Sequence, residues 1–145
     1  LTHQKDTAVL TLMNLESVLE RDFEVVSPDM TLGEMVSVIS VSHRNSFPVV
    51  DERGMLVGIV ELDNVRNIMF RPELYDRYKV RKIMVTPEVK VSSATPMTEV
   101  MRLFDETKAW KMPVVDEEGR YLGFISKSAI FNSYREVLNR TFIGD

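Results

Sequence analysis

Hydrophobic and polar positions along the chain predict one series of elements. The extended stretch "FEVVS" at residues 23–27 precedes apolar residues at helical spacing between residues 32 and 39. Two short apolar strands separated by a polar turn follow at residues 47–60. A second helical pattern then includes Val65 and Ile68. Together these features predict a β-α-β-β-α unit.

The whole unit is repeated 65 positions later. "FPVVDERGMLVGIV" at residues 47–60 matches "MPVVDEEGRYLGFI" at residues 112–125, and the offset holds without a gap from residue 15 to residue 63. Each copy is too small to bury both faces of a three-stranded sheet alone. We therefore expect an α/β (α+β) protein, in which two repeats pack sheet to sheet with pseudo-two-fold symmetry.

Each predicted first helix carries a start signal. Thr31 and Glu34 are spaced as a capping box, in which each side chain accepts a hydrogen bond from the other residue's backbone amide. In the second copy we expect Thr95 to cap the helix, with Pro96 at its first position.

Two pairs of glycines recur at equivalent positions in the hairpins. Gly54 and Gly119 fall where a tight turn requires positive φ. Gly58 and Gly123 lie inside strands, where glycine often marks the close approach of another backbone or a ligand.

Composition excludes several classes of protein. The net charge of −4 argues against a nucleic-acid binder, and the absence of cysteine removes disulfides and thiolate chemistry. The chain contains no run of about 18 apolar residues, so we expect no membrane-spanning helix. The chain does not begin with Met, which suggests a segment of a longer polypeptide.

The doubled "PVVD" hairpins between helices resemble the tandem cystathionine-β-synthase (CBS) domain pair, or Bateman module. "SFPVVDERG", "NIMFRPELYDRYKV" and "LTHQKDTAVLTLM" also look like the cytoplasmic tail of a bacterial CLC-type chloride channel or antiporter. The resemblance divides the chain into a lead-in (1–14), repeat 1 (15–70), a linker (71–79), repeat 2 (80–140) and a tail (141–145). It implies a non-catalytic regulatory module at the cytoplasmic face of the membrane, which forms a homodimer and contacts its own transmembrane transport domain.

The resemblance also implies a nucleotide signature, G-h-h-S/T-x-x-D, after each second strand. Its hydroxyl binds phosphate and its aspartate accepts from ribose hydroxyls. Repeat 1 has Glu61 and Asn64 at these two positions, whereas repeat 2 has Ser126 and Ala129. Because both copies lack the aspartate, we expect weak or absent binding of AMP, ADP or ATP.

Residues before each hairpin proline usually line the base pocket in this family, and others follow the first strand of each unit. The candidates are Asn45, Ser46, Phe47, Trp110, Lys111 and Met112, with Ser27, Ser92 and Thr95. Trp110 could stack on adenine while Lys111 meets phosphate. The alternative is that Trp110 packs at the rim of the inter-repeat core and Lys111 is solvated. The repeat-2 cleft is the better candidate for an anionic ligand.

Other constellations have structural explanations. Asp51-Glu52 and Asp116-Glu117 sit at hairpin turns, and His3 and His43 have no partner at ligand spacing, so we expect no metal site. The linker concentrates positive charge that could contact anionic lipid or acidic loops, through Arg71, Arg77, Lys79, Arg81 and Lys82. Two alternative functions remain: a ligand-free assembly domain, or a CBS pair that regulates an enzyme or a magnesium or other cation transporter.

Overall fold

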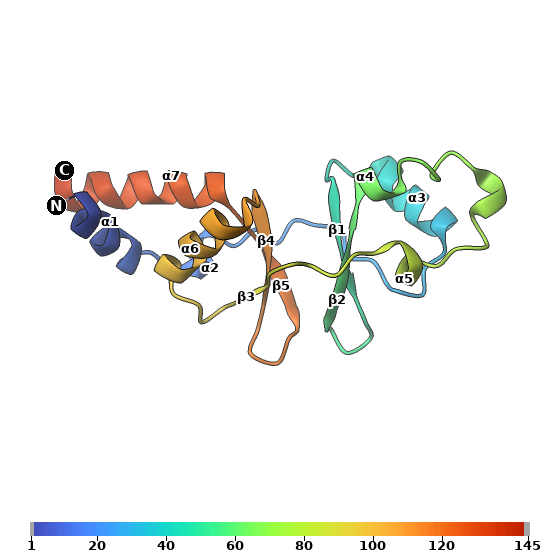
Figure 1. Cartoon of the computed structure of the whole chain (residues 1–145), viewed down its shortest axis with the longest axis horizontal. Coiled ribbons are helices and arrows are strands. Elements are labelled where there is room, and N and C mark those ends of the chain that lie inside the picture. The colour runs from blue at the N-terminus through green and yellow to red at the C-terminus, as the bar shows by residue number, and fades with distance from the viewer. Residues whose placement is uncertain (1, 144–145) are drawn as a thin grey trace. The chain divides into compact units, whose positions relative to one another are not determined.

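The computed structural model describes residues 2–143 and the side chains of residues 6–141. The chain forms two compact α+β units (Figure 1). Unit 1 contains Leu1–Arg21, Glu88–Glu117 and Leu122–Asp145. Unit 2 contains Asp22–Pro87 and Glu118–Tyr121. No helix within the described residues is long and apolar enough to cross a bilayer.

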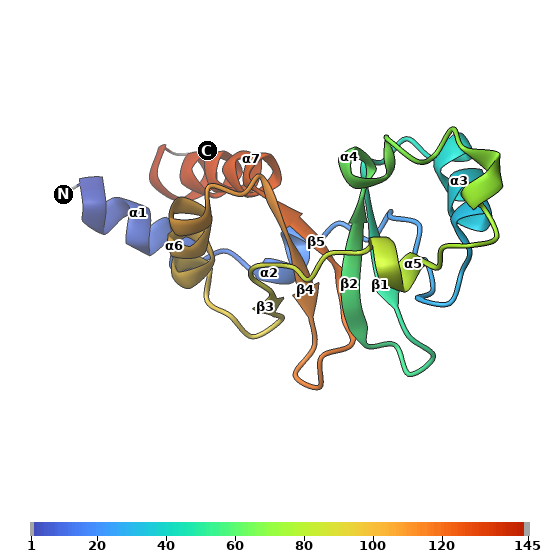
Figure 2. The ribbon, with the colours of Figure 1, turned by 45° about the vertical axis from the view of Figure 1, so that its right-hand side comes forward.

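Unit 1 has a three-stranded sheet in the order β3-β4-β5. The strands are β3 (Val91–Ser92), β4 (Lys111–Val115) and β5 (Tyr121–Ser126), and β3 is parallel to β4. The helices are α1 (Thr2–Thr11), α2 (Leu15–Val18), α6 (Met97–Thr107) and α7 (Lys127–Leu138), which continues into the π-helical turn η2 (Asn139–Ile143). Helix α1 contacts α6 and α7, and α2 contacts α7 (Figure 2). The core of unit 1 includes Phe104, Met112 and Ile125.

Unit 2 is built on an antiparallel hairpin of β1 (Ser46–Val50) and β2 (Leu56–Glu61). Val26 bridges Val49 in parallel, although the predicted "FEVVS" strand is reduced to this one bridge. The helices are α3 (Leu32–Val41), α4 (Leu62–Val65), the 3-10 turn η1 (Pro72–Leu74) and α5 (Val80–Ile83). Met35, Phe47 and Val60 belong to its core.

The opening segment of each repeat joins the sheet of the other repeat. Glu20 pairs with Phe124 in unit 1, and Val85 pairs with Ile59 in unit 2. These two bridges are related by the 65-residue offset. Residues 15–21, which open sequence repeat 1, therefore belong to unit 1 with most of repeat 2. Residues 80–87, which open repeat 2, belong to unit 2 with most of repeat 1. The packing of one unit's sheet on the other remains a prediction.

Three of the four hairpin glycines behave as the sequence predicts, and Gly58 is approached by a side chain instead of a backbone or a ligand. Gly54 (φ 85°) and Gly119 (φ 94°) adopt the left-handed conformation in their turns. A Cβ added to Gly58 would meet the Met84 sulfur at 2.6 Å, and one added to Gly123 would meet the Glu20 carbonyl oxygen at 2.5 Å. Glycine is thus needed where the exchanged segments cross the hairpins.

Two helix predictions need correction, and one is confirmed. The Thr31–Glu34 capping box is present. Thr95 does not cap α6: Pro96 occupies the cap position, because the Thr95 hydroxyl accepts instead from the Ser92 amide (3.0 Å). The predicted helix after the first hairpin is a single turn, α4, followed by turns through residue 70. Asparagines at positions 64 and 67 have low helix propensity there.

Candidate functional site

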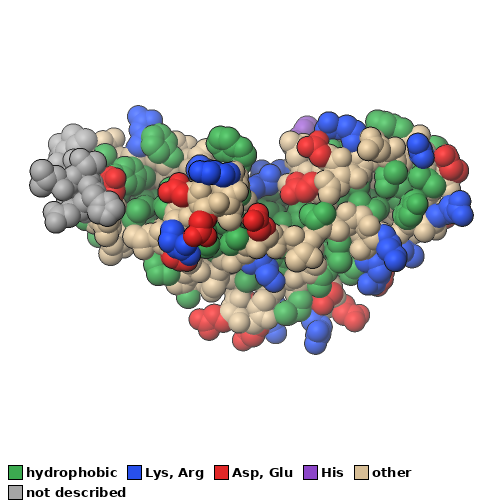
Figure 3. Space-filling model, viewed as in Figure 1, with side chains coloured by type: hydrophobic (Ala, Val, Ile, Leu, Met, Phe, Trp, Pro, Cys, Tyr) green, Lys and Arg blue, Asp and Glu red, His purple; other side chains and the backbone are tan. Residues whose placement is uncertain are grey.

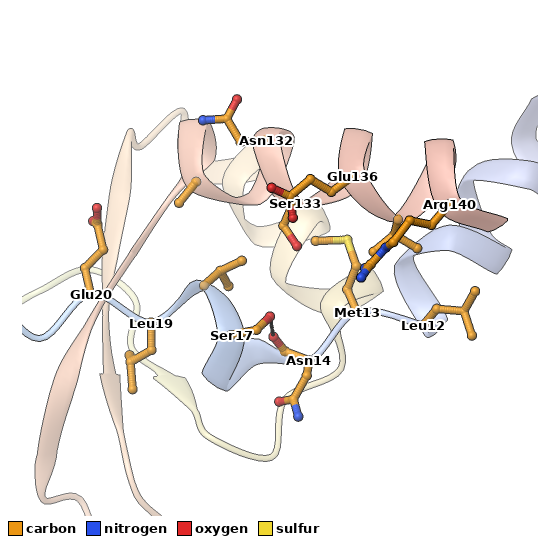
Figure 4. Close-up of a pocket in the computed structure, with 13 residues that line it drawn as sticks. Leu12, Met13, Asn14, Ser17, Leu19, Glu20, Asn132, Ser133, Glu136 and Arg140 are labelled. Carbon is orange, nitrogen blue, oxygen red and sulfur yellow. Dashed lines mark hydrogen bonds between the residues drawn. The ribbon is translucent and has the colours of Figure 1, made fainter. Parts of the chain in front are cut away.

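A pocket of about 680 Å³ lies in unit 1 between α2 and α7 (Figure 4). Asn14, Ser17 and residues 18–20 form one side, and α7 forms the other. In Figure 4, Ser133 lies on the side of α7 that faces α2, whereas Asn132 projects outward. A volume of several hundred Å³ suits a small organic ligand.

The first turn of α7 borders this pocket. Ala129, at the signature aspartate position, is a lining residue. The Ser126 hydroxyl caps α7 by accepting from the Ala129 amide (3.1 Å), and it lies 3.3 Å from the Ser128 hydroxyl. Lys111 begins β4 and Ser126 ends β5, and the Lys127 amide donates to the Trp110 carbonyl (3.0 Å), which holds these strand ends together. The Ser126 hydroxyl is therefore bonded to a residue that lines the pocket, and Lys111 begins the neighbouring strand.

Trp110 lies in a different hollow of unit 1. It is 79% exposed and does not belong to the core of unit 1. Its packing at the rim of a core between the two repeats remains a prediction. It lines an apolar groove of about 630 Å³ with Met101 and Phe131, and the Lys127 ammonium lies 5.5 Å from its ring centroid. Lys111 is not among the residues that line this groove. The structure thus separates Trp110 from Lys111, which the sequence had grouped around one ligand.

Asp6 and Tyr134 connect α1 to α7 at the same groove. The Tyr134 hydroxyl donates a hydrogen bond to the Asp6 carboxylate. This hydrogen bond, with smaller effects of burial and of the negative charge on Asp6, raises the pKa of Tyr134. The contact therefore depends on a protonated phenol.

Two of the unit 2 candidates, Asn45 and Glu61, line a much smaller hollow of about 110 Å³. Ser46 is fully buried, and its hydroxyl donates to the Glu61 carboxylate at 2.5 Å. Phe47 is also fully buried and belongs to the core, as does Met112 in unit 1. Asn64 is exposed on α4. Phe47 and Met112 therefore pack in the cores of their units, and their place in a base pocket remains a prediction.

The remaining candidates organise local turns. The Ser27 hydroxyl accepts from the Asp29 amide (3.2 Å), and the Ser92 hydroxyl accepts from the Ala94 amide (3.1 Å). Together with Thr95, these residues stabilise the turns that follow the first extended stretch of each repeat. None of the three lines the pockets described above.

Several polar residues of the 680 Å³ pocket had no sequence-based prediction. These are Glu20, Asn132, Ser133, Glu136 and Arg140. The last four follow Ala129 at intervals of three or four, which places polar groups on a helix face beside the buried Val137. These polar positions interrupt the apolar stripe of the helix, and from the sequence they could have indicated a polar pocket beside it. Nothing local predicts Glu20, because its segment joins this unit from the other repeat.

The turn carboxylates have structural partners. The Asp51 carboxylate accepts from the Arg53 and Met55 amides, both at 2.9 Å. Within the described part of the chain, no three His, Asp or Glu side chains cluster as metal ligands. His43 is exposed, and the side chain of His3 lies outside the described residues.

The basic linker lies on unit 2 and is partly packed. The Leu32 amide donates to the Tyr78 carbonyl (2.8 Å), and the Tyr75 hydroxyl donates to the Met69 carbonyl (2.6 Å). Arg81 pairs with Asp29. On the face shown in Figure 3, Lys and Arg side chains gather over the part of unit 2 that holds the linker. Tyr75 is thus explained by packing, while the cations remain exposed.

A family model for the CBS domain matches residues 15–71 and 80–136. Inosine-5'-monophosphate dehydrogenase of Bifidobacterium longum is 34% identical over 113 residues, covering 77% of this chain and 20% of that enzyme. The same enzyme of Methanocaldococcus jannaschii is 29% identical over 118 residues, covering 81% of this chain and 23% of that enzyme. The chain therefore spans about a fifth to a quarter of the length of these relatives.

Solved CBS structures share the fold. A CBS domain protein from Streptococcus pneumoniae has a TM-score of 0.78 at 20% identity, covering 94% of this chain and 96% of that one. The CBS domain of a bacterial CNNM/CorC family Mg²⁺ transporter in complex with ATP gives 0.75 at 15% identity, covering 91% and 94%. CBSX2 in complex with AMP gives 0.68 at 21% identity, covering 86% and 97%. With both matched segments inside one chain that has this fold, the protein belongs to the CBS-domain family and carries two CBS domains in tandem.

Proposed function

We propose that this chain is a regulatory module that binds an adenine nucleotide weakly in unit 1. The observation that carries the proposal is the 680 Å³ pocket beside the first turn of α7. The adenosine would occupy the pocket near Leu19 and Ala129, and the phosphates would extend toward Ser126 and Lys111. The nucleotide complexes of structural relatives support this ligand class.

Electrostatics support weak binding. Lys111 forms no ion pair with any described residue, so its ammonium is available to a phosphate. Ala129 cannot accept from a ribose hydroxyl, and a lost charged hydrogen bond is worth about 1.5–3 kcal/mol, or tenfold and more in affinity. Glu20 and Glu136 offer other acceptors in the pocket, but they also add negative charge. We expect dissociation constants above the low micromolar range.

Calorimetric titration with AMP, ADP and ATP tests the proposal. Ala129→Asp restores the missing acceptor and is expected to tighten binding about tenfold. Asn64→Asp makes the equivalent change in unit 2 and should leave affinity unchanged. No heat from any of the three nucleotides at millimolar concentration, in the wild type and in Ala129→Asp, would contradict the proposal and favour a ligand-free assembly domain.

The protein that carries the module is the second part of the proposal. The resemblance to a CLC-type tail favours an anion transport protein, with this module on the cytoplasmic face beside the transmembrane domain. The relatives named above favour instead the CBS pair of an enzyme or a magnesium transporter. Reading the coding sequence beyond both ends of the chain separates these parents, because a CLC tail follows a block of membrane helices.

Two contacts of the module are also proposed. A homodimer would cover the exposed Trp110 and Phe131, and sedimentation at tens of micromolar that shows only the monomer would contradict it. The linker cations at positions 71, 77, 79 and 82 would face anionic lipid or acidic loops of the parent protein.

A further inference from the structure

One pair of side chains differs in charge between two otherwise equivalent hairpins. Ser46 and Glu61 stand where the two strands of the unit 2 hairpin begin and end, and Lys111 and Ser126 stand 65 positions later in unit 1. The adjoining backbone contact is the same in both hairpins. The Leu62 amide donates to the Asn45 carbonyl at 2.8 Å, as the Lys127 amide does to the Trp110 carbonyl at 3.0 Å.

The unit 2 pair is closed upon itself. Ser46 is fully buried, and its hydroxyl donates to the Glu61 carboxylate at 2.5 Å. This hydrogen bond holds a negative charge at the end of β2. The hollow beside it measures only about 110 Å³, and within it Asp63 pairs with Arg66 at 2.9 Å. Arg66, the cation that lines this hollow, is therefore already paired with another carboxylate.

The unit 1 pair is open. Lys111 forms no ion pair with any described residue. The Ser126 hydroxyl accepts from the Ala129 amide, and its other neighbour is the Ser128 hydroxyl at 3.3 Å, which can itself act as the donor. The formal charge of the pair is +1 here, against −1 in unit 2. The amide that bonds the Ser126 hydroxyl belongs to Ala129, which lines the pocket of about 680 Å³.

We infer that Glu61, held in place by Ser46, excludes anionic ligands from unit 2, so that each chain takes one nucleotide in unit 1 and none in unit 2. The inference deepens the proposed function and rests on it for the unit 1 site. A carboxylate at the end of β2 repels a phosphate at short range, and Ser46 satisfies the carboxylate without adding positive charge. The two CBS domains of this chain are then unequal in function as well as in sequence.

Reciprocal exchange of the two pairs tests the inference, with ATP as the probe and calorimetry to count sites on the full chain. Ser46→Lys with Glu61→Ser gives unit 2 the unit 1 pair, and we expect the number of sites to rise from one to two. Lys111→Ser with Ser126→Glu gives unit 1 the unit 2 pair, and we expect ATP affinity to fall tenfold or more.

Two milder variants guard against misfolding. Glu61→Gln removes the charge but keeps an acceptor for the Ser46 hydroxyl, and it should open unit 2 partly. Ser46→Ala keeps the charge and should leave unit 2 closed. Thermal unfolding of each variant verifies that it is folded.

The outcomes separate the inference from the proposed function. One site in the wild type and two in the unit 2 exchange support both. No site in the wild type but one in the unit 2 exchange supports exclusion by Glu61 and contradicts the proposed unit 1 site. Two ATP sites in the wild type would overturn the inference. It would also be overturned if neither the folded unit 2 exchange nor Glu61→Gln gained an ATP site.

Discussion

Replacement of Gly123 by alanine should destabilise the protein more than the same change at its repeat equivalent, Gly58. A Cβ at Gly123 would lie 2.5 Å from the Glu20 carbonyl oxygen, a distance that real Cβ atoms essentially never show. The exchanged segment must therefore move away from β5. At Gly58 the nearest atoms all belong to the Met84 side chain: the sulfur at 2.6 Å, Cγ at 2.9 Å and Cβ at 3.1 Å. Rotation of this flexible side chain moves the sulfur and Cγ away and leaves only the Cβ contact to be relieved by a small shift.

The hydrogen bonds between Glu20 and Phe124 determine how much unfolding free energy Gly123→Ala should lose. The Glu20 amide donates to the Phe124 carbonyl at 2.8 Å, and the Phe124 amide donates to the Glu20 carbonyl at 2.9 Å. Loss of both hydrogen bonds costs about 2 kcal/mol. Alanine returns about 0.5–1 kcal/mol because glycine is unfavourable in strands. We expect Gly123→Ala to cost about 1–1.5 kcal/mol net, and Gly58→Ala less than about 1 kcal/mol.

Urea unfolding of the two variants and the wild type, followed by far-UV circular dichroism, measures the difference. At a few degrees per kcal/mol, Gly123→Ala should also lower the melting temperature by about 3–8 °C. Equal losses in the two variants would refute the reasoning, since it assigns the larger cost to a backbone neighbour. So would a Gly123→Ala protein as stable as the wild type.

Two further predictions concern single hydrogen bonds. Tyr134→Phe removes the bond to Asp6 and should cost about 1 kcal/mol in urea unfolding near pH 7. Because the folded state raises the pKa of Tyr134, the wild-type bond stabilises fully below the unfolded pKa of about 10, and this stability is lost as the pH rises through the folded pKa. The difference between variant and wild type should therefore shrink above about pH 10, and a pH-independent difference would contradict this. Thr31→Ala removes the capping-box hydroxyl of α3 and should cost about 1 kcal/mol, whereas Thr31→Ser should retain most of that stability.

Residues that act on their immediate neighbours were predictable. The Thr31–Glu34 capping box and the positive φ of Gly54 and Gly119 depend on a few adjacent positions, and the structure has all three. Thr95 shows the limit of this reasoning. Its hydroxyl could accept either from the Ser92 amide or from an amide in the first turn of α6, and in the structure it accepts from Ser92.

The site itself was predictable only in part. The resemblance to CBS domains marked Ala129 as the signature aspartate position, and Ala129 lines the pocket. Trp110 and Lys111 are adjacent in sequence, and the sequence grouped them around one ligand. Of these two residues, Trp110 lines the apolar groove and Lys111 does not. Which residue faces the groove depends on the helices α1, α6 and α7 that form its other walls, and these lie far from residue 110 or 111 in the sequence or pack there only in the folded chain.

The amino-acid sequence alone determined that the chain contains two copies of one β-α-β-β-α unit, since hydrophobic periodicity, turn glycines and the 65-residue offset are all readable along the chain. Only the tertiary structure decided that residues 15–21 and 80–87 exchange between the repeats, and that Ser46 holds Glu61. Each of these contacts joins segments far apart in sequence. Their energies come from backbone pairing and burial at one place in space, and no local pattern records which distant segment will supply the partner.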